Sequence, residues 1–521
     1  MKLRPHLRLV KPLPHFPTDG LAVLALVALC GSLFFRELGS RELWASHEAR
    51  AAQNARRMLD DGDWLLPRLY DDQVELQKPV GYYWLAAATG RARGGVDAVA
   101  VRLPAAVAGT VTVLMVWGFL RRRGRPVAAV VAAAGLASAA HFTGTARVGR
   151  IDVPLTCAVT VLMLGGWSLF AHGLPARSVG EGREAPSPTF RTGRRLASIA
   201  PLGLVAAFAL LLKGPIGFVL PAAALAIYWL SVRVPLTRFL AYGTAVGVIG
   251  VAVAAPWYLW ANHETGGEFF RAFFLYHHVN RAFGGAEALA GHPWWYYAPR
   301  FAADFLPWTP AVLVALVYRR WRGDSDAWFG LVWMAVMIAV LSLSRFKRAD
   351  YLLPAYPGAA LFLGCVAERW FLTRSPRARR IAACGFAGGI ILLPLGWYAF
   401  DRLVTDKAEA THEQAPFAHI AREATGGQIL LFRVESHLLA FHLGRPVHTL
   451  VEWGELGARL AGPGPHFVVT RAEFLDEVRD HVPGPIEVLC HSADVTRAPP
   501  RRPLVLLRID PGPNSWPKPP D

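Results

Sequence analysis

The chain has 521 residues, of which 53% are hydrophobic, and a formal net charge of +17. Its apolar runs repeatedly reach about 17–25 residues, the length that a helix needs to cross a bilayer, which favours a polytopic membrane protein over a large soluble helical protein. The positive charge does not indicate a nucleic-acid-binding protein, because the arginines gather in short loops between apolar runs, the pattern that sets membrane orientation. These loops contain Arg121, Arg122, Arg123 and Arg125; Arg319, Arg320 and Arg322; and Arg374, Arg377, Arg379 and Arg380.

The N-terminal segment, residues 1–20, is basic and proline-rich and is predicted to be a cytoplasmic tail. The first apolar run, 21–35, is followed by Arg36, Glu37 and Leu38 rather than by a small-residue cleavage pattern. We therefore interpret it as a membrane helix and not as a signal peptide. Residues 38–97 then form a loop on the outer face of the membrane.

This outer loop holds acidic, basic and aromatic residues beside the membrane, where such groups lie at the water interface or line a cavity. Ser46 is predicted to cap a helix that lies along the membrane surface and ends at Gly62. A second interfacial helix is predicted to begin at Lys78, before an aromatic cluster. The loop is the candidate catalytic loop.

Ten further membrane spans are predicted, which makes about eleven in a transmembrane domain over residues 21–400. Alternation from a cytoplasmic N-terminus puts every arginine-rich loop inside. It puts 38–97, 145–152, a tight turn at Lys213, 261–303 and 345–351 outside, and residues 173–196 form a flexible inner loop. The ten spans cover roughly 98–120, 126–144, 153–172, 197–212, 214–232, 239–260, 304–320, 327–344, 352–371 and 381–400.

The tail, residues 401–521, changes character and is predicted to be a small extracytoplasmic α/β domain. Strand-length runs at 428–432, 467–470 and 504–509 alternate with helical stretches at 436–443 and 471–482. The final segment, 511–521, is expected to be disordered because it is rich in proline and polar residues.

The predicted topology gathers many polar residues on one side of the membrane, several of them in short turns at helix ends. Lysine and arginine beside lipid suit a phosphate or pyrophosphate head group, and carboxylates among them are suited to acid–base chemistry. These residues are His47, Glu48, Arg50, Lys78, Arg147, Arg150, Asp152, Lys213, His277, His278, Asn280, Arg281, Arg345, Lys347 and Tyr351.

Each of these residues has a purely structural alternative. Lys213 could extend to the interface as a snorkelling side chain, and Asp152 could be only the N-cap of a helix that starts at Pro154. His277 and His278 are more typical of packed or solvated histidines than of metal ligands. We expect no metal site and no cofactor, and the five cysteines show no ligand spacing.

Several short motifs occur in a specific order over about residues 40–370. They read HEAR-x-AQNARRML-x-x-GDW, QKPVGYYW, AVRLPAA, ARVGRIDVPLT, LLKGP, APWY, FF-x-YHHVNR, LPWTP and KRADYLLPAYPG. In order and placement they resemble the bacterial lipid-linked-sugar glycosyltransferases, which include the aminoarabinose transferase of lipid A and relatives among the protein O-mannosyltransferases. The resemblance implies a GT-C-like membrane fold and a polyprenyl-phosphate-sugar donor.

The resemblance also implies roles for individual residues. Asp152 corresponds to the second acidic residue of the family, and the groups around the donor phosphate correspond to Arg50, Lys78, Lys213, Arg281 and Tyr351.

Two positions depart from the family pattern. The family usually reads Asp-Glu-x-Arg where this chain has His47-Glu48-Ala49-Arg50, and Glu-Lys-Pro where it has Gln77-Lys78-Pro79. The catalytic base is therefore open between His47 and Glu48, and a third possibility is that no base is needed.

The sequence predicts a multi-pass glycosyltransferase of the bacterial cytoplasmic membrane that moves a sugar from polyprenyl phosphate to a lipid A-like or protein acceptor. Its partners are the donor, the acceptor and membrane lipids, with no nucleic acid. The alternatives are a transporter or flippase for the lipid-linked sugar, and an accessory protein that binds polyprenyl phosphate without catalysis. No convincing internal repeat supports a transporter.

Overall fold

The computed structural model describes residues 17–510 except 44, 71–72, 172–187, 281–290, 427–428, 435–436, 445–446, 463, 499 and 501. The chain divides into two compact units. The first, called the membrane unit below, comprises Met1–Leu38, Leu76–Leu85 and Arg102–Gly396. The second, called the tail unit, comprises Gly39–Glu75, Ala86–Val101 and Trp397–Asp521. The outer-face loop predicted from the sequence is therefore shared between them.

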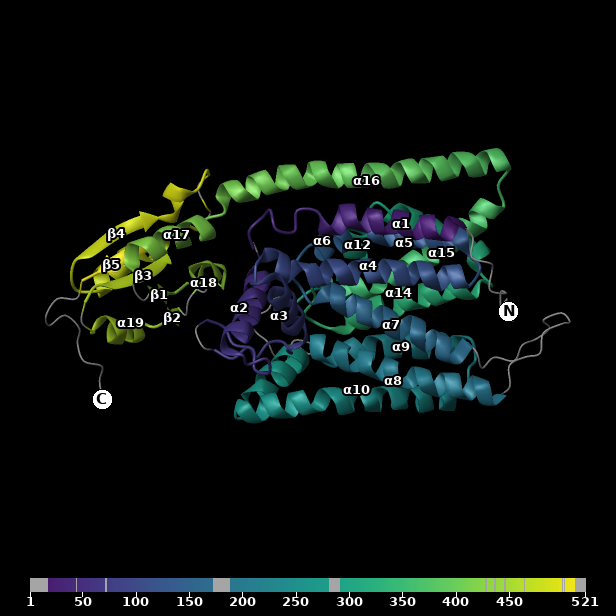
Figure 1. Cartoon of the computed structure of the whole chain (residues 1–521), viewed down its shortest axis with the longest axis horizontal. Coiled ribbons are helices and arrows are strands. Elements are labelled where there is room, and N and C mark those ends of the chain that lie inside the picture. Colours follow the sequence, from purple (N-terminus) through teal and green to yellow (C-terminus); the bar gives the residue numbers. More distant parts are fainter. Residues whose placement is uncertain are drawn as a thin grey trace. The chain divides into compact units, whose positions relative to one another are not determined.

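The membrane unit is built from helices alone in its described part (Figure 1). Its elements are α1 (Pro17–Cys30), η1 (Gly31–Phe35), the start of α3 (Gly81–Arg93), α4 (Ala98–Arg122), α5 (Pro126–Ala137), α6 (Ala140–Ala146), α7 (Asp152–Ala171), α8 (Pro188–Lys213), α9 (Ile216–Ser231), α10 (Leu236–Glu264), η2 (Phe270–Asn280), η3 (Trp294–Tyr296), α12 (Tyr297–Asp304), α13 (Thr309–Val317), η4 (Arg319–Trp321), α14 (Ser325–Leu343), η5 (Ala349–Ala355), α15 (Tyr356–Leu372) and the start of α16 (Pro376–Thr411).

The apolar helices match the predicted spans. Six are long and apolar enough to cross a membrane, two further segments are helix pairs bent by 62° and 114°, and three are shorter apolar helices. Each of the eleven predicted spans therefore corresponds to a helix or a bent helix pair among the described residues. The helical fold class predicted from the sequence is confirmed.

Two of the predicted boundaries are wrong. The inner loop predicted over 173–196 ends earlier, because α8 begins at Pro188, a residue favoured in the first turn of a helix. The span predicted over 304–320 is instead a bent pair, Trp294–Asp304 with Thr309–Val317. Pro307 lies in the break between them, and proline has no N–H to continue the helical hydrogen bonds. Residues 1–16, 172–187 and 511–521, which include most of the predicted cytoplasmic tail and the predicted disordered end, lie outside the described residues.

Small residues let neighbouring helices of the membrane unit approach closely. A Cβ added to Gly330 of α14 would lie 2.6 Å from the backbone nitrogen of Phe362 in α15. A Cβ added to Gly81 at the start of α3 would lie 2.7 Å from the carbonyl oxygen of Leu211 in α8. Such close approaches are typical of helix packing in membranes. The second contact holds the segment before α3 against the end of α8.

The tail unit contains a five-stranded mixed sheet with the strand order β2-β1-β3-β5-β4. The strands are β1 (Ile429–Phe432), β2 (His448–Leu450), β3 (His466–Arg471), β4 (Ile486–His491) and β5 (Leu504–Ile509). Strands β1, β2 and β3 are parallel, and β5 pairs antiparallel with β3 and β4. Three strands and both helical stretches were predicted, but β2 and β4 were missed.

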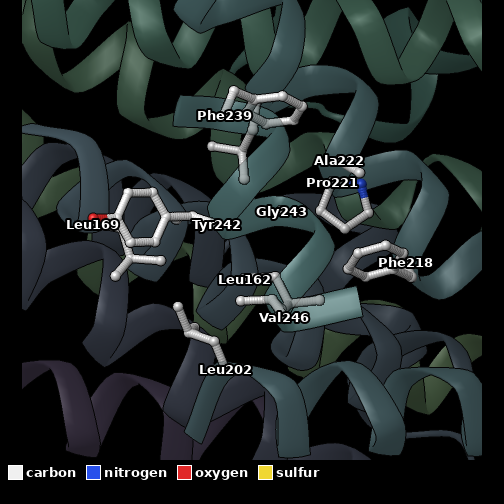
Figure 2. A pocket seen from close by; sticks show the side chains of 12 residues that line it. Leu162, Leu169, Leu202, Phe218, Pro221, Ala222, Phe239, Tyr242, Gly243 and Val246 are labelled. Atoms are coloured by element: carbon white, nitrogen blue, oxygen red, sulfur yellow. The ribbon is translucent and has the colours of Figure 1, made fainter. Parts of the chain in front are cut away.

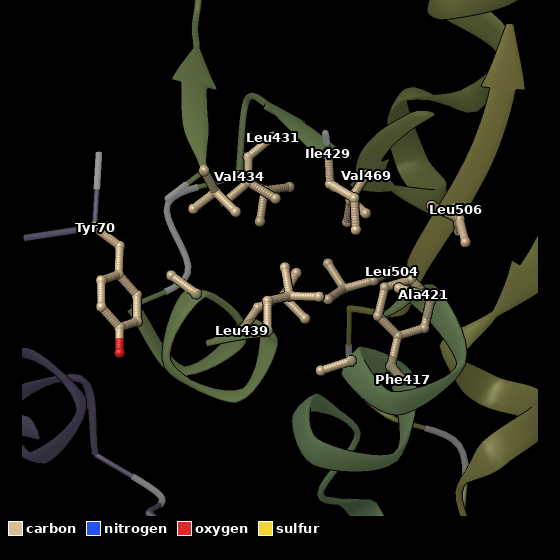
Figure 3. Close-up of a cluster of buried hydrophobic side chains, with 14 residues drawn as sticks. Tyr70, Phe417, Ala421, Ile429, Leu431, Val434, Leu439, Val469, Leu504 and Leu506 are labelled. Carbon is tan, nitrogen blue, oxygen red and sulfur yellow. The ribbon is translucent and has the colours of Figure 1, made fainter. Parts of the chain in front are cut away.

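Side chains alternate between the two faces of the sheet, as the twofold period of a strand requires. Leu431, Val469 and Leu506 pack on one face with α17 (Gln414–Thr425) and α18 (His437–Leu443), as Figure 3 shows. Leu430, Val468 and Leu507 pack on the other face with α19 (Trp453–Leu460) and α20 (Leu475–His481). The tail unit is therefore a three-layer α/β fold. The short η6 (Ala472–Phe474) and η7 (Ser492–Val495) complete it.

The tail unit also contains the first helix of the predicted catalytic loop, α2 (Ser46–Asp61). Gln53 of α2 donates to the carbonyl oxygen of His437 in α18 (2.7 Å) and accepts from the backbone N–H of Tyr70 (3.2 Å). Tyr70 joins the core of the sheet (Figure 3).

The helix α2 ends at Gly62 (φ 72°) as predicted. The predicted cap is wrong, because Ala45 is the N-cap residue and Ser46 is already helical. The second helix begins at Gly81 rather than at Lys78.

Candidate functional site

A cavity of about 230 Å³ in the membrane unit brings together several residues that were predicted from the sequence. Its polar lining combines two lysines with two aspartates, and the rest of its wall is mostly apolar. The lining residues are Gln77, Lys78, Pro79, Ile151, Asp152, Leu155, Leu212, Lys213, Ile216, Leu220, Phe273, His277, Leu341, Ser344, Phe346, Asp350, Tyr351 and Pro354. We call it the Lys213 cavity.

Helix ends position the charged groups of the Lys213 cavity. Lys213 is the last residue of α8, and Gly214 (φ +74°) follows it in a left-handed conformation that reverses the chain into α9. The predicted tight turn at Lys213 is thus confirmed. Asp152 is the first residue of α7. The close contact of Gly81 with Leu211 anchors the segment that carries Lys78 beside the end of α8.

Asp152 and Lys213 form a short ion pair. The Lys213 Nζ lies 2.5 Å from Asp152 Oδ1 and 4.1 Å from the ring centroid of Tyr351. Arg150 Nε lies 3.4 Å from the other carboxylate oxygen of Asp152. The side chain of Asp152 is only 4% exposed. The predicted N-cap role is wrong, because Asp152 is itself the first residue of α7. Lys213 has a fixed anionic partner and an aromatic face rather than a freely extended chain.

Asp350 extends this charged cluster and was not assigned a role from the sequence. Its Oδ2 lies 2.7 Å from a guanidinium nitrogen of Arg150, and its Oδ1 lies 3.2 Å from His141 Nε2. Arg150 thus bridges the carboxylates of Asp152 and Asp350. The only signal in the sequence was the position of Asp350 next to Tyr351 in the motif KRADYLLPAYPG.

A third carboxylate, that of Asp304, continues the cluster beyond the cavity. Nδ1 of His141 lies 3.0 Å from the Tyr356 hydroxyl and 3.4 Å from Asp304 Oδ2. Asp304 in turn accepts from Arg300 Nε at 2.7 Å. Lys213, Asp152, Arg150, Asp350, His141, Asp304 and Arg300 therefore form one continuous chain of polar contacts. Such pairing is what allows charges to remain buried.

Lys347 lies near the cavity but serves the backbone. Its ammonium donates to the carbonyl oxygens of His292 (3.0 Å) and Ser344, and the residue is 3% exposed. Burial lowers the pKa of the Lys347 side chain. Lys347 therefore fixes the loop between α14 and η5, which carries Ser344 and Phe346 of the cavity wall.

The first predicted motif belongs to the tail unit. Glu48 is buried (2% exposed), whereas His47 is half-buried. Arg50 makes a bidentate contact with Glu75, with Nε–Oε2 and Nη2–Oε1 distances of 3.0 and 2.7 Å. Glu75 was missed by sequence reasoning, although it lies three residues before Lys78. Arg50 thus has an intramolecular carboxylate partner in this structure.

The predicted residues His277, His278 and Arg281 divide into two groups. His277, on η2, lines the Lys213 cavity. Arg281 and the side chain of His278 lie outside the described residues. A donor-phosphate role for Arg281 therefore stays a prediction.

A second pocket of the membrane unit cannot perform the same chemistry. It measures about 50 Å³ and lies among side chains of α7, α8, α9 and α10, including Leu162, Phe218, Tyr242 and Val246 (Figure 2). No charged residue lines it. An anion has no partner there, so the Lys213 cavity is the stronger candidate for a functional site.

The composition of the Lys213 cavity suits an amphipathic anion. The two lysines provide positive charge for a phosphate, and an apolar wall that includes Leu155, Leu220 and Leu341 can contact a hydrocarbon chain. Asp152 keeps Lys213 paired and can give up this contact when a phosphate arrives. A lipid phosphate matches both parts of the cavity.

Known proteins share features of this chain. The family model described as dolichyl-phosphate-mannose-protein mannosyltransferase matches residues 20–305. The undecaprenyl phosphate-alpha-4-amino-4-deoxy-L-arabinose arabinosyl transferase of Pseudomonas aeruginosa (strain LESB58) is 30% identical over 398 residues, which cover 76% of this chain and 67% of the relative. A second transferase of the same description, from Pseudomonas fluorescens (strain Pf0-1), is 31% identical over 330 residues, which cover 63% of this chain and 56% of the relative.

Solved structures share the fold. The crystal structure of ArnT from Cupriavidus metallidurans bound to undecaprenyl phosphate has a TM-score of 0.71 at 19% identity and covers 94% of this chain and 98% of that chain. The archaeal oligosaccharyltransferase AglB from Archaeoglobus fulgidus has a TM-score of 0.56 at 12% identity, and the match covers 88% of this chain and 70% of that chain. At these identities the similarity establishes the architecture.

Proposed function

Since the chain belongs to the dolichyl-phosphate-mannose-protein mannosyltransferase family, we propose that it transfers a sugar from undecaprenyl phosphate to a lipid A-like acceptor. As a member of this family it is an integral membrane glycosyltransferase that uses a polyprenyl-phosphate-linked sugar. The aminoarabinose specificity of the relatives supports a pentose donor. A protein hydroxyl is the alternative acceptor.

The Lys213 cavity carries this proposal. Its lysines and Tyr351 surround a position for the donor phosphate, and its apolar wall provides a path for the first isoprene units. Arg50 and Arg281 remain further candidates for phosphate contacts. The single observation that supports the assignment best is the Asp152–Lys213 pair at 2.5 Å inside a cavity that is otherwise mostly apolar.

The chemistry is a displacement at the anomeric carbon of the sugar. The acceptor oxygen forms the new bond while the bond to the phosphate oxygen breaks, and polyprenyl phosphate leaves with an additional negative charge. Lys213 and Lys78 stabilise that charge as it develops, because preorganised cations act strongly where water is excluded. Arg150 keeps the carboxylate of Asp152 in place while Lys213 turns toward the phosphate.

The acceptor decides whether a base is needed. A hydroxyl acceptor loses a proton, for which Glu48 or Asp152 is our candidate base and His47 the alternative. A phosphate acceptor is already ionised and needs none. The His47 substitution at the usual acidic position favours the phosphate acceptor.

We further propose that the protein lies in the cytoplasmic membrane of a bacterium with its N-terminus inside and its tail domain outside. The number of apolar segments and the alternation of arginine-rich loops support this orientation. The Lys213 cavity then opens on the outer face.

The test is turnover in vesicles that contain the purified full-length protein, undecaprenyl phosphate carrying a radiolabelled sugar, and a lipid A-like acceptor. The proposal predicts label in the acceptor and release of undecaprenyl phosphate. Movement of intact donor across the bilayer without release would indicate a transporter. Binding of undecaprenyl phosphate with neither transfer nor movement would indicate an accessory protein.

A further inference from the structure

A groove of about 770 Å³ lies between α4 and α7 in the membrane unit. Most of its lining is apolar, and two arginines lie at one end, where α4 terminates. Gly118 deepens the groove, because no atom lies within 4 Å of the position that its Cβ would take. The lining residues are Val111, Leu114, Met115, Gly118, Phe119, Arg122, Arg123, Val161, Leu164, Gly165, Trp167 and Ser168. We call it the α4–α7 groove.

The arginines around the end of α4 differ in their partners. Arg121 pairs with Asp19 at 2.6 Å, and Arg125 pairs with Asp324 and Glu368, both at 2.8 Å. These contacts neutralise the two guanidinium groups within the protein and join α1, α5, α14 and α15.

The two arginines of the groove have different surroundings. Arg123 pairs with Asp326 at 2.6 Å and lies 4.3 Å from the centroid of the Trp167 ring. The side chain of Arg122 is exposed, and within the described part of the chain it has neither an acidic partner nor a hydrogen bond. Among the described residues, the mouth of an apolar groove therefore presents one uncompensated positive charge.

The α4–α7 groove is separate from the Lys213 cavity. Asp152 of that cavity is the first residue of α7, whereas the groove uses Val161 to Ser168 of the same helix. At a rise of about 1.5 Å per residue, the groove lies roughly 14–24 Å further along α7. Under the proposed orientation this end faces the cytoplasm.

We propose that the α4–α7 groove binds an anionic phospholipid. Its acyl chains lie against Leu114, Met115 and Leu164, and its phosphate contacts Arg122. Basic pockets between membrane helices on the cytoplasmic side bind the head groups of anionic lipids in this manner. The site is distinct from donor binding and does not depend on the transfer reaction.

The shape of the groove distinguishes a lipid from a soluble anion. A free phosphate or a nucleotide needs several polar partners. The groove offers Arg122, whereas Arg123 is paired with Asp326 and the Ser168 hydroxyl donates to the carbonyl oxygen of Leu164. A phospholipid satisfies both the charge and the apolar wall. Phosphatidylglycerol and phosphatidylcholine share acyl chains and differ in net charge, so their competition isolates the contribution of Arg122.

The experiment measures bound lipids by native mass spectrometry. Purified full-length protein in an uncharged detergent receives equal amounts of phosphatidylglycerol and phosphatidylcholine. The wild type is expected to retain phosphatidylglycerol preferentially. Arg122→Gln should lower the ratio of bound phosphatidylglycerol to phosphatidylcholine about fivefold, the effect of about 1 kcal/mol per basic residue. Gly118→Leu should reduce retention of both lipids, because the new side chain fills the groove.

Two matched variants test whether these effects are local. Arg377→Gln removes an exposed arginine at the start of α16, and Gly385→Leu adds a side chain at an exposed glycine of α16 with no atom near its Cβ. Both should retain the wild-type lipid ratio.

Equal retention of the two lipids by the wild type would overturn the proposal. The same fall in the ratio of bound phosphatidylglycerol to phosphatidylcholine in Arg377→Gln would also overturn it. Displacement of phosphatidylglycerol by soluble glycerol phosphate would also overturn it, because the site would then bind a free anion. Thermal unfolding in the same detergent verifies that the variants are folded. If Gly118→Leu is not folded, the lipid ratio of Arg122→Gln alone tests the proposal.

Discussion

At the scale of single residues, the Lys213 cavity depends on charges that compensate one another. The side chains of Asp152 and Lys213 are 4% and 19% exposed, so neither can lose its partner without leaving a poorly hydrated charge. Removing one member of a buried pair typically costs about 3–5 kcal/mol. The same pair is available for catalysis, because a donor phosphate can replace the carboxylate as the partner of Lys213.

The first prediction separates these two roles. Lys213→Met should lower turnover about 10²–10³-fold, the effect of removing one electrostatic contact in a transition state. It should also lower thermal stability, because the buried Asp152 loses its shorter ion pair and keeps only the 3.4 Å contact with Arg150 among the described residues. Adding Asp152→Asn to Lys213→Met should restore much of the stability but none of the activity, as measured by thermal unfolding and by sugar transfer. Arg377→Met, at an exposed position, is the control. Recovery of activity in the double variant would show that the pair is structural only.

The second prediction concerns the base. Glu48 is the buried carboxylate of the first motif, and His47 beside it is half-buried. With a hydroxyl acceptor, which must lose a proton, we expect Glu48→Gln and Asp152→Asn to lose far more activity than His47→Asn, and His47→Asp, which restores the family pattern, to be tolerated. Initial rates of sugar transfer at saturating donor concentration measure the activity of all four variants. An inactive His47→Asn together with an active Glu48→Gln would make histidine the base and contradict the assignment.

At the scale of elements, α18 of the tail unit carries a histidine in an environment that disfavours its charge. Burial lowers the pKa of His442 to about 4, and the neighbouring side chains of His412, Arg56 and Arg422 add to the effect. Glu42 Oε2, at 3.8 Å from His442 Nε2, is the nearest opposing charge. The folded tail unit therefore favours neutral His442.

The third prediction follows from this shift. Because the folded pKa lies below the value of 6.5 for a free histidine, the unfolded state binds the proton first as the pH falls. Stability is thus fully present above pH 6.5 and is lost as the pH falls toward 4, by about 2 kcal/mol between pH 7 and pH 5. Hydrogen exchange of α18 and β1, corrected for intrinsic rates, measures the loss.

A histidine substitution checks the origin of this pH dependence. His442→Gln should reduce the slope between pH 7 and pH 5, whereas His419→Gln, which removes an exposed histidine of α17, should keep it. If stability depends on pH with the same slope in the wild type and in His442→Gln, the pH dependence arises from a group other than His442.

Elements were predictable from the sequence where one local signal dominated. Apolar length identified all eleven spans, and Gly62 and the turn after Lys213 were found from their local chemistry. The short strand β2 and the strand β4 were missed because each is stabilised by its neighbours in the sheet rather than by its own pattern. The bend in the segment with Pro307 and the start of α8 at Pro188 were also missed, although each has a proline as a local signal.

The candidate site was predictable to a similar extent. Eight residues were predicted to form one site, and the Lys213 cavity contains four of them, Lys78, Asp152, Lys213 and Tyr351. The other four are His47, Glu48 and Arg50, which belong to the tail unit, and Arg281, which lies outside the described residues. Asp350, His141 and Glu75 were missed, because a partner carboxylate or histidine far away in the sequence leaves no periodic signal. Ion pairs between residues that are distant in the sequence can be identified only from the folded structure.

At the scale of the whole molecule, the charges are arranged in two ways. Arginines around 121–125 are compensated by Asp19, Asp324, Asp326 and Glu368, apart from Arg122. The Lys213 cavity instead combines lysines with aspartates in a mostly apolar wall. Under the proposed orientation the first set lies at the cytoplasmic side and the second at the outer side.

The fourth prediction tests this orientation. A reporter that is active only in the cytoplasm should be silent when fused after Asp401, and active when fused in the loop around Arg322. Cells that produce each fusion at equal level provide the measurement. Activity after Asp401 would place the tail domain inside and would remove the Lys213 cavity from the outer face.

The most direct test of the central claim asks where the donor lipid binds. Undecaprenyl phosphate with a photoreactive group on the isoprene unit next to the phosphate is bound to the purified full-length protein and crosslinked, and the labelled peptides are identified by mass spectrometry. The account predicts labels on the apolar wall of the Lys213 cavity, at Leu155, Leu220 or Leu341, that excess undecaprenyl phosphate prevents and that Lys213→Met weakens. Labels confined to residues outside this cavity, unaffected by Lys213→Met, would contradict it.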